Sequence, residues 1–318
     1  MGLNVAIQMD PPGSLNYHKD TTYLLGLEAI KRGHALSYYN VDTLALREGK
    51  VTATCHPLAF RREEGNEFTL GDGKTTELKN FDLILMRQDF NSPIAYSSYT
   101  HILDHLKNDV LILNDPAGVR ESPEKMLITH FPDLAPPTLL SRNLDQIKEF
   151  QKQYEDIIVK PLNGFGGLDV YHAKPGDDNI TSVFDMMTRL HPGPLVVQKY
   201  LPEIKDGDKR IIVIEGEPVG AFSRIAAKGN ARANLASGGS AVKAEVTQRD
   251  KEICARIKPE LVKRGLVLVG LDVIGGFVTE INPKSPTGCH QVNDFNNIKC
   301  EEIAWDAYEK RLGRNKRL

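Results

Sequence analysis

Three oxygen-bearing side chains interrupt an apolar stretch in the second half of the chain, and their types suit a magnesium ion. Asp272, Glu280 and Asn282 are the only strongly polar residues in the stretch 269–282. Mg²⁺ is a hard cation that takes carboxylate and amide oxygens, usually together with substrate phosphates. Because Glu280 and Asn282 are two residues apart, a strand directs both side chains to one face. The stretch therefore predicts a metal site on a β-hairpin.

The pairing of the two strands decides whether Asp272 joins this face. If Asp272 lies directly opposite Glu280, the turn is centred on Gly276 and holds an odd number of residues, most simply three. A two-residue turn of Gly275 and Gly276 would instead pair Asp272 with Thr279 and direct Glu280 to the opposite face. We expect the three-residue turn. The alternative for the whole stretch is an ordinary hairpin whose polar residues face solvent.

A second chemical pattern is a lysine followed by a glycine-rich loop. Lys160 ends an expected strand, and Gly164, Gly166 and Gly167 follow it. Backbone N–H groups in such a loop can surround phosphoryl oxygens without obstruction by side chains, and the lysine can reach the same phosphates. Lys125 is a second candidate phosphate ligand. The alternatives are a connection whose glycines serve only the turn, and a solvated surface lysine at position 125.

A third pattern places two arginines on neighbouring strands. Asp208 and Arg210 share one face of an expected strand at a spacing of two, and Arg224 ends the next strand. Guanidinium groups bind carboxylates and phosphates bidentately, so a pair suits a substrate that carries both groups. The alternative is a charged turn, which is the interpretation we favour for Lys205 and Lys209.

Two further segments are candidates because they connect regular elements. The strand end at 198–201 can present backbone groups to an adenine ring, or it is a plain linker. The small and polar segment 232–239 can close over a ligand, with the Gly239 N–H directed at a developing oxyanion, or it is a disordered surface loop.

These residues need a scaffold, and the first part of the chain alternates between strand and helix patterns. Buried parallel strands are indicated at 3–9, 81–86 and 110–113, and helices at 22–32 and 96–106. The alternation predicts a doubly wound parallel unit over about residues 1–120, with a hairpin excursion at 51–78.

The rest of the chain has the pattern of an antiparallel α+β structure. Expected strands lie at 157–160, 170–173, 195–198, 210–214 and 219–223. Expected helices lie at 144–154, 180–190, 248–264 and 301–311. We therefore expect three domains, at 1–121, 122–200 and 201–318.

Composition excludes several classes of partner. The net charge of −2, from 40 basic and 42 acidic residues, gives no basic surface for nucleic acid. No apolar run approaches the roughly 20 residues of a membrane span, and no signal peptide is evident. The four cysteines have no zinc spacing and are expected to be free thiols in a reducing compartment. We expect a cytoplasmic protein with no nucleic-acid or membrane partner.

Several catalytic motifs are missing. No G-x-G-x-x-G follows the first strand, and the glycine that a Walker loop would need falls on Phe68. Neither G-x-S-x-G nor H-E-x-x-H occurs. The sequence therefore supports neither hydride transfer nor serine hydrolysis.

Taken together, the order and spacing of the motifs resemble the ATP-grasp ligases, and more closely the prokaryotic glutathione synthetase family. The resemblance extends over nearly the whole chain. It rests on the segments 9–11, 18–20, 86–87, 123–125, 160–167, 204–210, 215–218, 234–239, 269–272, 279–282 and 285–287.

The resemblance implies an ATP-grasp fold, α/β and α+β, with an N-terminal doubly wound parallel-sheet domain (the pre-ATP-grasp domain). It also implies condensation of γ-glutamylcysteine with glycine through an acyl phosphate, with release of ADP and phosphate. ATP would be the co-substrate and two Mg²⁺ ions the cofactors. The family further suggests a homo-oligomer, with a tetramer as the expected form.

The resemblance also assigns roles to residues. It implies that Lys125, Lys160 and the glycine loop hold the ATP phosphates, and that Gln198, Lys199, Tyr200 and Leu201, together with Asp208, hold adenine and ribose. Metal ligands would be Asp272, Glu280 and Asn282, and the oxyanion would be stabilised by Arg210 and Gly239. The peptide and glycine would be bound by Lys19, Asp20, Arg87, Arg224, Asn234, Ser285 and Thr287.

The sequence departs from the family pattern beside the expected substrate pockets. After Arg87 the family usually has Lys-Asp and two prolines, where this chain has residues 88–91, Gln-Asp-Phe-Asn. Pro283-Lys284 and the segment 288–291 also differ from the expected pattern. The alternatives are therefore an ATP-grasp ligase that joins a different amine to a different carboxylate, and a nucleotide-binding relative without turnover.

Overall fold

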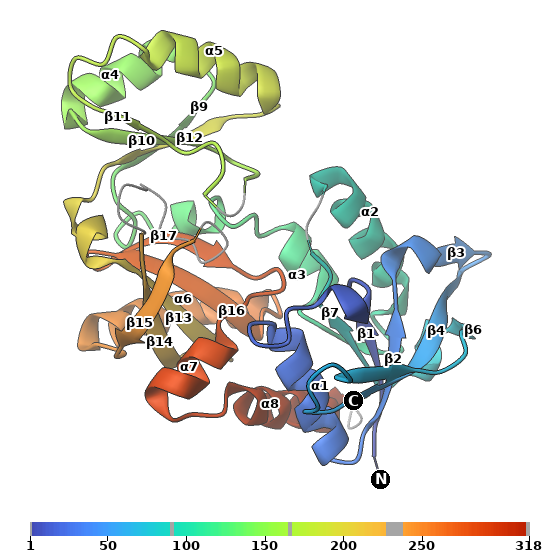
Figure 1. Ribbon diagram of the computed structural model, residues 1–318. Helices are drawn as coiled ribbons and strands as arrows, with labels where there is room; N and C mark the ends of the chain where they lie inside the picture. The colour runs from blue at the N-terminus through green and yellow to red at the C-terminus, as the bar shows by residue number, and fades with distance from the viewer. Residues whose placement is uncertain (1, 90–91, 165–166, 227–237, 316–318) are drawn as a thin grey trace.

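The computed structural model describes residues 2–89, 92–164, 167–226 and 238–315. Within these ranges, no helix is long and apolar enough to cross a membrane. The described residues form three sheets, which Figure 1 shows as an N-terminal unit, a small upper unit and a C-terminal unit.

The N-terminal sheet has parallel strands at its centre, as expected. The neighbouring strands are β2 (Ala35–Tyr39), β1 (Asn4–Gln8), β7 (Leu83–Met86) and β8 (Leu111–Leu113). The expected excursion appears as an antiparallel extension: β4 (Lys50–Phe60) pairs with β2 and carries β3 (Ala45–Arg47), β5 (Phe68–Leu70) and β6 (Lys74–Glu77).

Three helices accompany this sheet, and the two that were predicted both begin earlier than expected. They are α1 (Thr21–Lys31), α2 (Pro93–Leu103) and α3 (Pro116–Arg120). Helix α2 was expected at 96–106. It starts at Pro93 because Ser92 Oγ accepts the N–H of Ala95 at 3.4 Å and proline is favoured in a first helical turn. A 3₁₀ turn, Asp104–Leu106, follows it.

The small sheet is antiparallel and has a core of its own. Its strands, in order, are β11 (Tyr171–Ala173), β10 (Ile157–Pro161), β12 (Leu195–Lys199) and β9 (Thr138–Ser141). Helices α4 (Leu144–Tyr154) and α5 (Ile180–Leu190) cover one face (Figure 1). Ile147, Met187 and Val197 belong to a buried cluster that contains only residues of this unit.

The C-terminal sheet is antiparallel and covered on both faces. Its strands, in order, are β15 (Ser240–Ala244), β14 (Glu217–Ile225), β13 (Asp208–Ile214), β16 (Leu268–Ile274) and β17 (Phe277–Asn282). Its helices are α6 (Gln248–Lys263), α7 (Cys289–Asn296) and α8 (Cys300–Asn315).

Strand β13 shows how this sheet orients its side chains. Ile211 shares a buried cluster with Ile257 of α6, whereas Ile212 shares another with Trp305 of α8. Alternate residues of a strand point to opposite faces. Arg210 therefore lies on the α8 side of the sheet, together with Ile212.

The N-terminal unit and the C-terminal sheet form one continuous body. Both large buried clusters contain residues of both units. Asn114 Nδ2 donates to the carbonyls of Leu268 and Pro283 at 2.8 Å each, and Trp305 Nε1 donates to the carbonyl of Leu25 at 2.8 Å. The small sheet is therefore the only one of the three sheets whose described residues form a separate core.

Candidate active site

The β16–β17 hairpin places Asp272 opposite Glu280, as predicted, but by another route. The turn contains only Gly275 and Gly276, with φ angles of 57° and 81°, which a two-residue hairpin turn of type I′ requires. The expectation of a three-residue turn is wrong. Thr279 is an extra residue in β17, and this bulge shifts the register so that Asp272 pairs with Glu280.

Asp272 is the centre of a buried network of charges. Arg210 binds it through two nitrogens, with Nη2 at 3.0 Å from Oδ2. Arg224 Nη2 lies 3.0 Å from the same oxygen and also donates to Asp208. Asn282 Nδ2 donates to Asp272 Oδ2 at 3.3 Å. The pairing of Arg210 with Asp272, and of Asp208 with Arg224, follows from the registers of β13 with β16 and β14.

The pKa values of the two carboxylates in this network are shifted in opposite directions. Burial opposes ionisation of Asp272, but Arg210 and Arg224 outweigh it and hold the pKa of Asp272 below its ordinary value. Burial raises the pKa of Asp208 to about 7 despite Arg224, and the charge of Asp272 adds to this rise. Asp208 Oδ1 is buried and has no hydrogen-bond partner among the described residues.

Two lysines from distant segments meet at Glu280. Lys125 and Lys160 are both buried, and their Nζ atoms lie 3.6 and 3.7 Å from Glu280 Oε1. Lys125 also donates to the carbonyl of Gly164 in the glycine loop. Gly167, with φ of 73°, has a conformation that favours glycine. Burial lowers the pKa of Lys160, as expected for an ammonium group removed from water.

The hairpin residues fit a magnesium ion. Within the described ranges, no three Asp, Glu, His or Cys side chains converge tightly enough to hold a metal by themselves. Mg²⁺, however, is usually held by only one or two carboxylates together with substrate phosphates. Asp272 and Glu280 supply two carboxylates on one face, and Asn282 turns its Nδ2 to Asp272, which leaves its amide oxygen as a ligand.

The expected adenine segment lies at the end of β12. Gln198 is buried, and the N–H groups of Lys199 and Tyr200 donate to backbone carbonyls at 3.0 and 2.9 Å. The ring of Tyr200 stacks on His172 with centroids 4.1 Å apart. Leu201 is half-buried, and its carbonyl accepts the N–H of Ile204 at 3.1 Å.

Two predicted substrate residues, Ser285 and Thr287, lie on the segment that follows the hairpin, and a third, Arg87, contacts this segment from the N-terminal domain. Arg87 Nη2 donates to the carbonyl of Pro286 at 3.1 Å, and Ser285 Oγ donates at 3.0 Å to the carbonyl of the residue after Arg87. The carbonyl of Thr287 accepts from Arg210 Nη1 at 3.3 Å. The structure thus connects Arg87 to the Asp272 network through residues 285–287.

The remaining predicted residues either have other surroundings than this network or lie outside the described residues. Lys19 is exposed, and Asp20 caps α1 by accepting a first-turn N–H at 2.6 Å. Gly239 is half-buried and directly precedes β15. Gly166 and Asn234 lie outside the described residues.

Glu124 is a functional candidate that the sequence reasoning missed. Its carbonyl accepts the N–H of Ile281 at 3.0 Å, which places it beside the hairpin. Burial and the charge of Glu280 raise the pKa of the Glu124 carboxyl. Its position directly before Lys125 was the available signal, because a residue next to a phosphate ligand lies near the same site.

The site consists of two lysines, two arginines and an Asp–Glu–Asn hairpin. It lies between the small sheet and the C-terminal sheet, and the chain also has an N-terminal parallel-sheet domain. This combination of site and fold defines an ATP-grasp ligase. Solved structures agree on the fold. A D-cycloserine synthetase has a TM-score of 0.69 at 15% identity, covering 97% of this chain and 99% of that one. The D-alanyl-alanine synthetase A of Vibrio cholerae has a TM-score of 0.62 at 14% identity, covering 98% and 99%.

The sequence comparisons identify the family. The model of the prokaryotic glutathione synthetase N-terminal domain matches residues 3–120, and that of the prokaryotic glutathione synthetase ATP-grasp domain matches residues 124–297. A glutathione synthetase of Mesorhizobium japonicum is 45% identical over 309 residues, which cover 97% of this chain and 99% of the relative. One of Brucella melitensis is 44% identical over 311 residues, covering 98% and 100%. The chain belongs to the prokaryotic glutathione synthetase family and is an ATP-dependent ligase.

Proposed function

We propose that this ligase joins the cysteinyl carboxylate of γ-glutamylcysteine to the amine of glycine, converting ATP to ADP and phosphate. The observation that carries the proposal is the meeting of Lys125, Lys160 and Arg210 with the Asp272–Glu280 hairpin. Such a concentration of buried cations next to oxygen ligands suits a triphosphate and the carboxylate that it activates. The two substrates are inferred from the named relatives.

The lysines and the glycine loop would bind the phosphates of ATP. Lys125 and Lys160 share Glu280 as their partner, so their ammonium groups are already directed at the position of the hairpin. Gln198, Lys199, Tyr200 and Leu201 would hold the adenine. The unpartnered Oδ1 of Asp208 would accept a ribose hydroxyl.

The hairpin would hold two Mg²⁺ ions through Asp272, Glu280 and Asn282. When bound there, Mg²⁺ would supply positive charge that offsets the charge of the phosphates during transfer. Arg210 contacts both oxygens of the Asp272 carboxylate and Arg224 contacts one, so the carboxylate is held in position before a metal binds.

The first chemical step activates the donor. The cysteinyl carboxylate oxygen would attack the γ-phosphorus of ATP as the bond to ADP breaks, which forms an acyl phosphate. The glycine amine would then attack the acyl carbon, lose a proton, and displace phosphate. No side-chain nucleophile is required, because the substrate itself carries the activated group.

Arg210 and the Gly239 N–H would stabilise the oxyanion that forms in the second step. Loss of one such donor typically costs about 3–4 kcal/mol in the transition state. Arg87, Arg224, Lys19, Asp20, Asn234, Ser285 and Thr287 would orient the peptide and glycine. Acyl phosphates hydrolyse, so the loops at 162–168 and 226–240 would exclude water. Residues 165–166 and 227–237 of these loops lie outside the described residues.

The organisation of the protein adds three proposals based on the family. We propose domain boundaries near residues 121 and 200, a homo-oligomeric assembly with four subunits, and a cytoplasmic location. The four free, buried cysteines are compatible with a reducing compartment.

One assay tests the proposed reaction. Purified protein is given ATP, Mg²⁺, γ-glutamylcysteine and glycine, and phosphate release is measured with each component omitted in turn. We expect release only with all four. No release under any condition would contradict the ligase activity, whereas release with other amines but not glycine would favour a ligase of different specificity. Lys205→Met, at an exposed lysine outside the site, is the control variant.

A further inference from the structure

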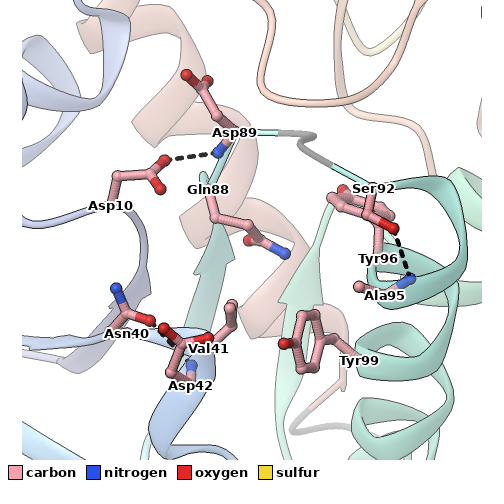
Figure 2. A pocket seen from close by; sticks show the side chains of 10 residues that line it. All are labelled: Asp10, Asn40, Val41, Asp42, Gln88, Asp89, Ser92, Ala95, Tyr96 and Tyr99. Atoms are coloured by element: carbon pink, nitrogen blue, oxygen red, sulfur yellow. Dashed lines mark hydrogen bonds between the residues drawn. The ribbon is translucent and has the colours of Figure 1, made fainter.

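Two cavities at the carboxyl ends of the N-terminal parallel strands differ in size and in lining. The larger has a volume of about 180 Å³, faces helix α2, and has an amide and three acids in its wall, Gln88, Asp10, Asp42 and Asp89 (Figure 2). The smaller has a volume of about 10 Å³, room for about one water molecule. Arg87 and Tyr308 are among the residues that line it. The smaller cavity therefore admits only a very small molecule.

The smaller cavity lies beside a pair of buried cysteines. Cys289 and Cys300 are 2% and 0% exposed, and both belong to the buried cluster that contains Tyr308. The Cys300 thiol donates a hydrogen bond to the Cys289 sulfur. Arg87 and Tyr308, from the cavity wall, both interact electrostatically with Cys289. The fold thus brings two thiols into contact where only a small molecule has access.

Two helix starts hold the thiols in this position. Cys289 is the first residue of α7, and Cys300 is the first residue of α8. Asn293 of α7 connects the helices, because its Oδ1 accepts the N–H of Cys300 at 2.8 Å and its Nδ2 donates to Glu301 Oε2 at 2.6 Å. Thiols that already contact each other need only a small movement to form an S–S bond of about 2.05 Å.

Cys289 differs from the other three cysteines in its ionisation. The hydrogen bond from Cys300 lowers the pKa of Cys289, against the opposing effect of burial. The same hydrogen bond, together with burial, raises the pKa of Cys300. Burial raises the pKa of Cys55 to about 11 and that of Cys254 to about 12. Because the thiolate is the form that reacts with oxidants and helix N-termini favour it, Cys289 is suited to attack and Cys300 to resolve.

We propose that Cys289 and Cys300 form a reversible disulfide in the presence of hydrogen peroxide, and that this disulfide slows the ligase. The Cys289 sulfur attacks one peroxide oxygen, the O–O bond breaks, and a sulfenic acid and one water form. The Cys300 sulfur then attacks the sulfenic sulfur, and the hydroxyl leaves with the Cys300 proton as a second water. The two sulfurs lose two electrons, which the peroxide gains. A dithiol reductant restores both thiols, in keeping with the transient disulfides of reducing compartments.

The segment before Cys289 connects the thiol pair to the proposed active site. The carbonyl of Thr287 accepts from Arg210 Nη1 at 3.3 Å. Gly288 alone separates Thr287 from Cys289; its φ is 121°, and a Cβ there would lie 2.8 Å from the Phe222 ring. Because this packing leaves little slack, movement of Cys289 in the disulfide displaces the carbonyl that Arg210 contacts. A displacement of about 1 Å can cost about a hundredfold in rate.

The first experiment oxidises the whole protein. Reduced protein is treated with hydrogen peroxide, the peroxide is removed with catalase, free thiols are alkylated, and the cysteine peptides are mapped by mass spectrometry. We expect the peptides of Cys289 and Cys300 to be cross-linked, with the loss of two hydrogen atoms. In unalkylated samples, the kcat for phosphate release should fall by about tenfold or more and recover with dithiothreitol. The donor in this assay is γ-glutamyl-α-aminobutyrate, which has no thiol that could reduce the disulfide.

Variants separate the roles of the two sulfurs. Cys289→Ser should keep the wild-type kcat before treatment and should resist peroxide, because the attacking sulfur is gone. Cys300→Ser should be inactivated without recovery, because a sulfenic acid without a resolving thiol proceeds to a sulfinic acid, which dithiothreitol does not reduce. Cys55→Ser is the matched control: its buried thiol donates to the carbonyl of Ala53 at 3.7 Å, and the variant should respond to peroxide like the wild type.

Three results would contradict the switch. Peroxide-treated wild type without a cross-link between Cys289 and Cys300 would overturn the disulfide, and so would equal inactivation of Cys289→Ser and the wild type. A cross-link that leaves kcat unchanged would overturn its effect on the ligase. The cross-link is detected without turnover, so the test of the disulfide is independent of the substrates proposed above.

Discussion

The network around Asp272 lies within the C-terminal sheet, the cavity around Gln88 lies beyond the ends of the N-terminal parallel strands, and their charges are balanced differently. Asp272 accepts from Arg210, Arg224 and Asn282. Gln88, in contrast, has no partner for its amide, and the acids beside it have no lysine or arginine in the cavity wall. In the first cluster the charged side chains bind one another, so the protein itself fixes their positions. In the second, the amide and the acids need a ligand to satisfy their hydrogen bonds and charges.

The difference has a consequence for stability. Removing a member of a balanced buried network leaves a charge without its partner, so function and stability fall together. Substituting an acid of the cavity wall removes a repulsion, and substituting Gln88 removes a buried amide without a partner. Function should therefore fall while the free energy of unfolding stays the same or rises. Four substitutions test this contrast, from the largest effect to the smallest.

Asp272→Asn should have the largest effect. It leaves Arg210 and Arg224 buried with less compensating charge, and we expect the free energy of unfolding to fall by about 3 kcal/mol. Turnover should fall by about a hundredfold or more, because the proposed metal ligand is lost. Urea denaturation and phosphate release measure the two effects, with Asp206→Asn at an exposed position as the control. An unchanged unfolding free energy would remove the distinction between the two clusters.

Glu280→Gln should reduce Mg²⁺-dependent turnover by about tenfold to a hundredfold without unfolding the protein. Glu280 is partly exposed, with 25% side-chain accessibility, and its lysine partners are 3.6 and 3.7 Å away, so its loss is better tolerated than that of Asp272. A titration of activity against Mg²⁺ should show a higher requirement in the variant. Wild-type activity at every Mg²⁺ concentration would exclude Glu280 from the metal site.

Lys160→Met should raise the KM for ATP by about tenfold, as expected for a lost charged contact to phosphate. The change in unfolding free energy should stay within about 1 kcal/mol, because burial already disfavours the ammonium form and Lys125 still faces Glu280. Steady-state kinetics and thermal unfolding provide the measurements. A large loss of stability would show that Lys160 supports the fold as strongly as Asp272 does.

Asp89→Asn should have the smallest effect, and of opposite sign. The pKa of Asp89 is raised in the folded protein, so its ionised form costs stability above that pKa and nothing below the ordinary value of about 3.9. Because the carboxyl is exposed, we expect a gain of only about 0.5 kcal/mol or less at pH 7, shrinking toward pH 4 and in high salt. Urea denaturation at several pH values tests this, and a loss of stability at pH 7 would contradict the raised pKa of Asp89, which burial and the charges of Asp10 and Asp20 cause.

Local patterns predicted many of the elements well. Helix α4 occupies the predicted residues 144–154, because Asn143 Oδ1 caps it by accepting the N–H groups of Asp145 and Gln146 at 2.8 and 3.2 Å. Helix α6 likewise begins after a capping box of Thr247 and Asp250. Such signals act over a few residues, so they can be read without knowledge of the rest of the chain.

The bulge at Thr279 shows where local reading fails. Counting turn residues alone made a two-residue Gly275–Gly276 turn incompatible with the pairing of Asp272 and Glu280. The structure has both, because one extra residue in β17 corrects the register. Packing of Val278 and Ile281 into the core beneath the sheet specifies that register, and this packing involves residues far away in the chain.

The sequence by itself determined many of the strands and helices, the shared face of Glu280 and Asn282, and the candidate residue types, since each depends on spacing within one element. Only the tertiary structure decided that Lys125, Lys160 and Glu280 meet within 3.7 Å, and that Gln88 lies buried beside Asp10 and Asp42. These groups come from separate elements, and their distances are set by how the elements pack, which no spacing along the chain encodes.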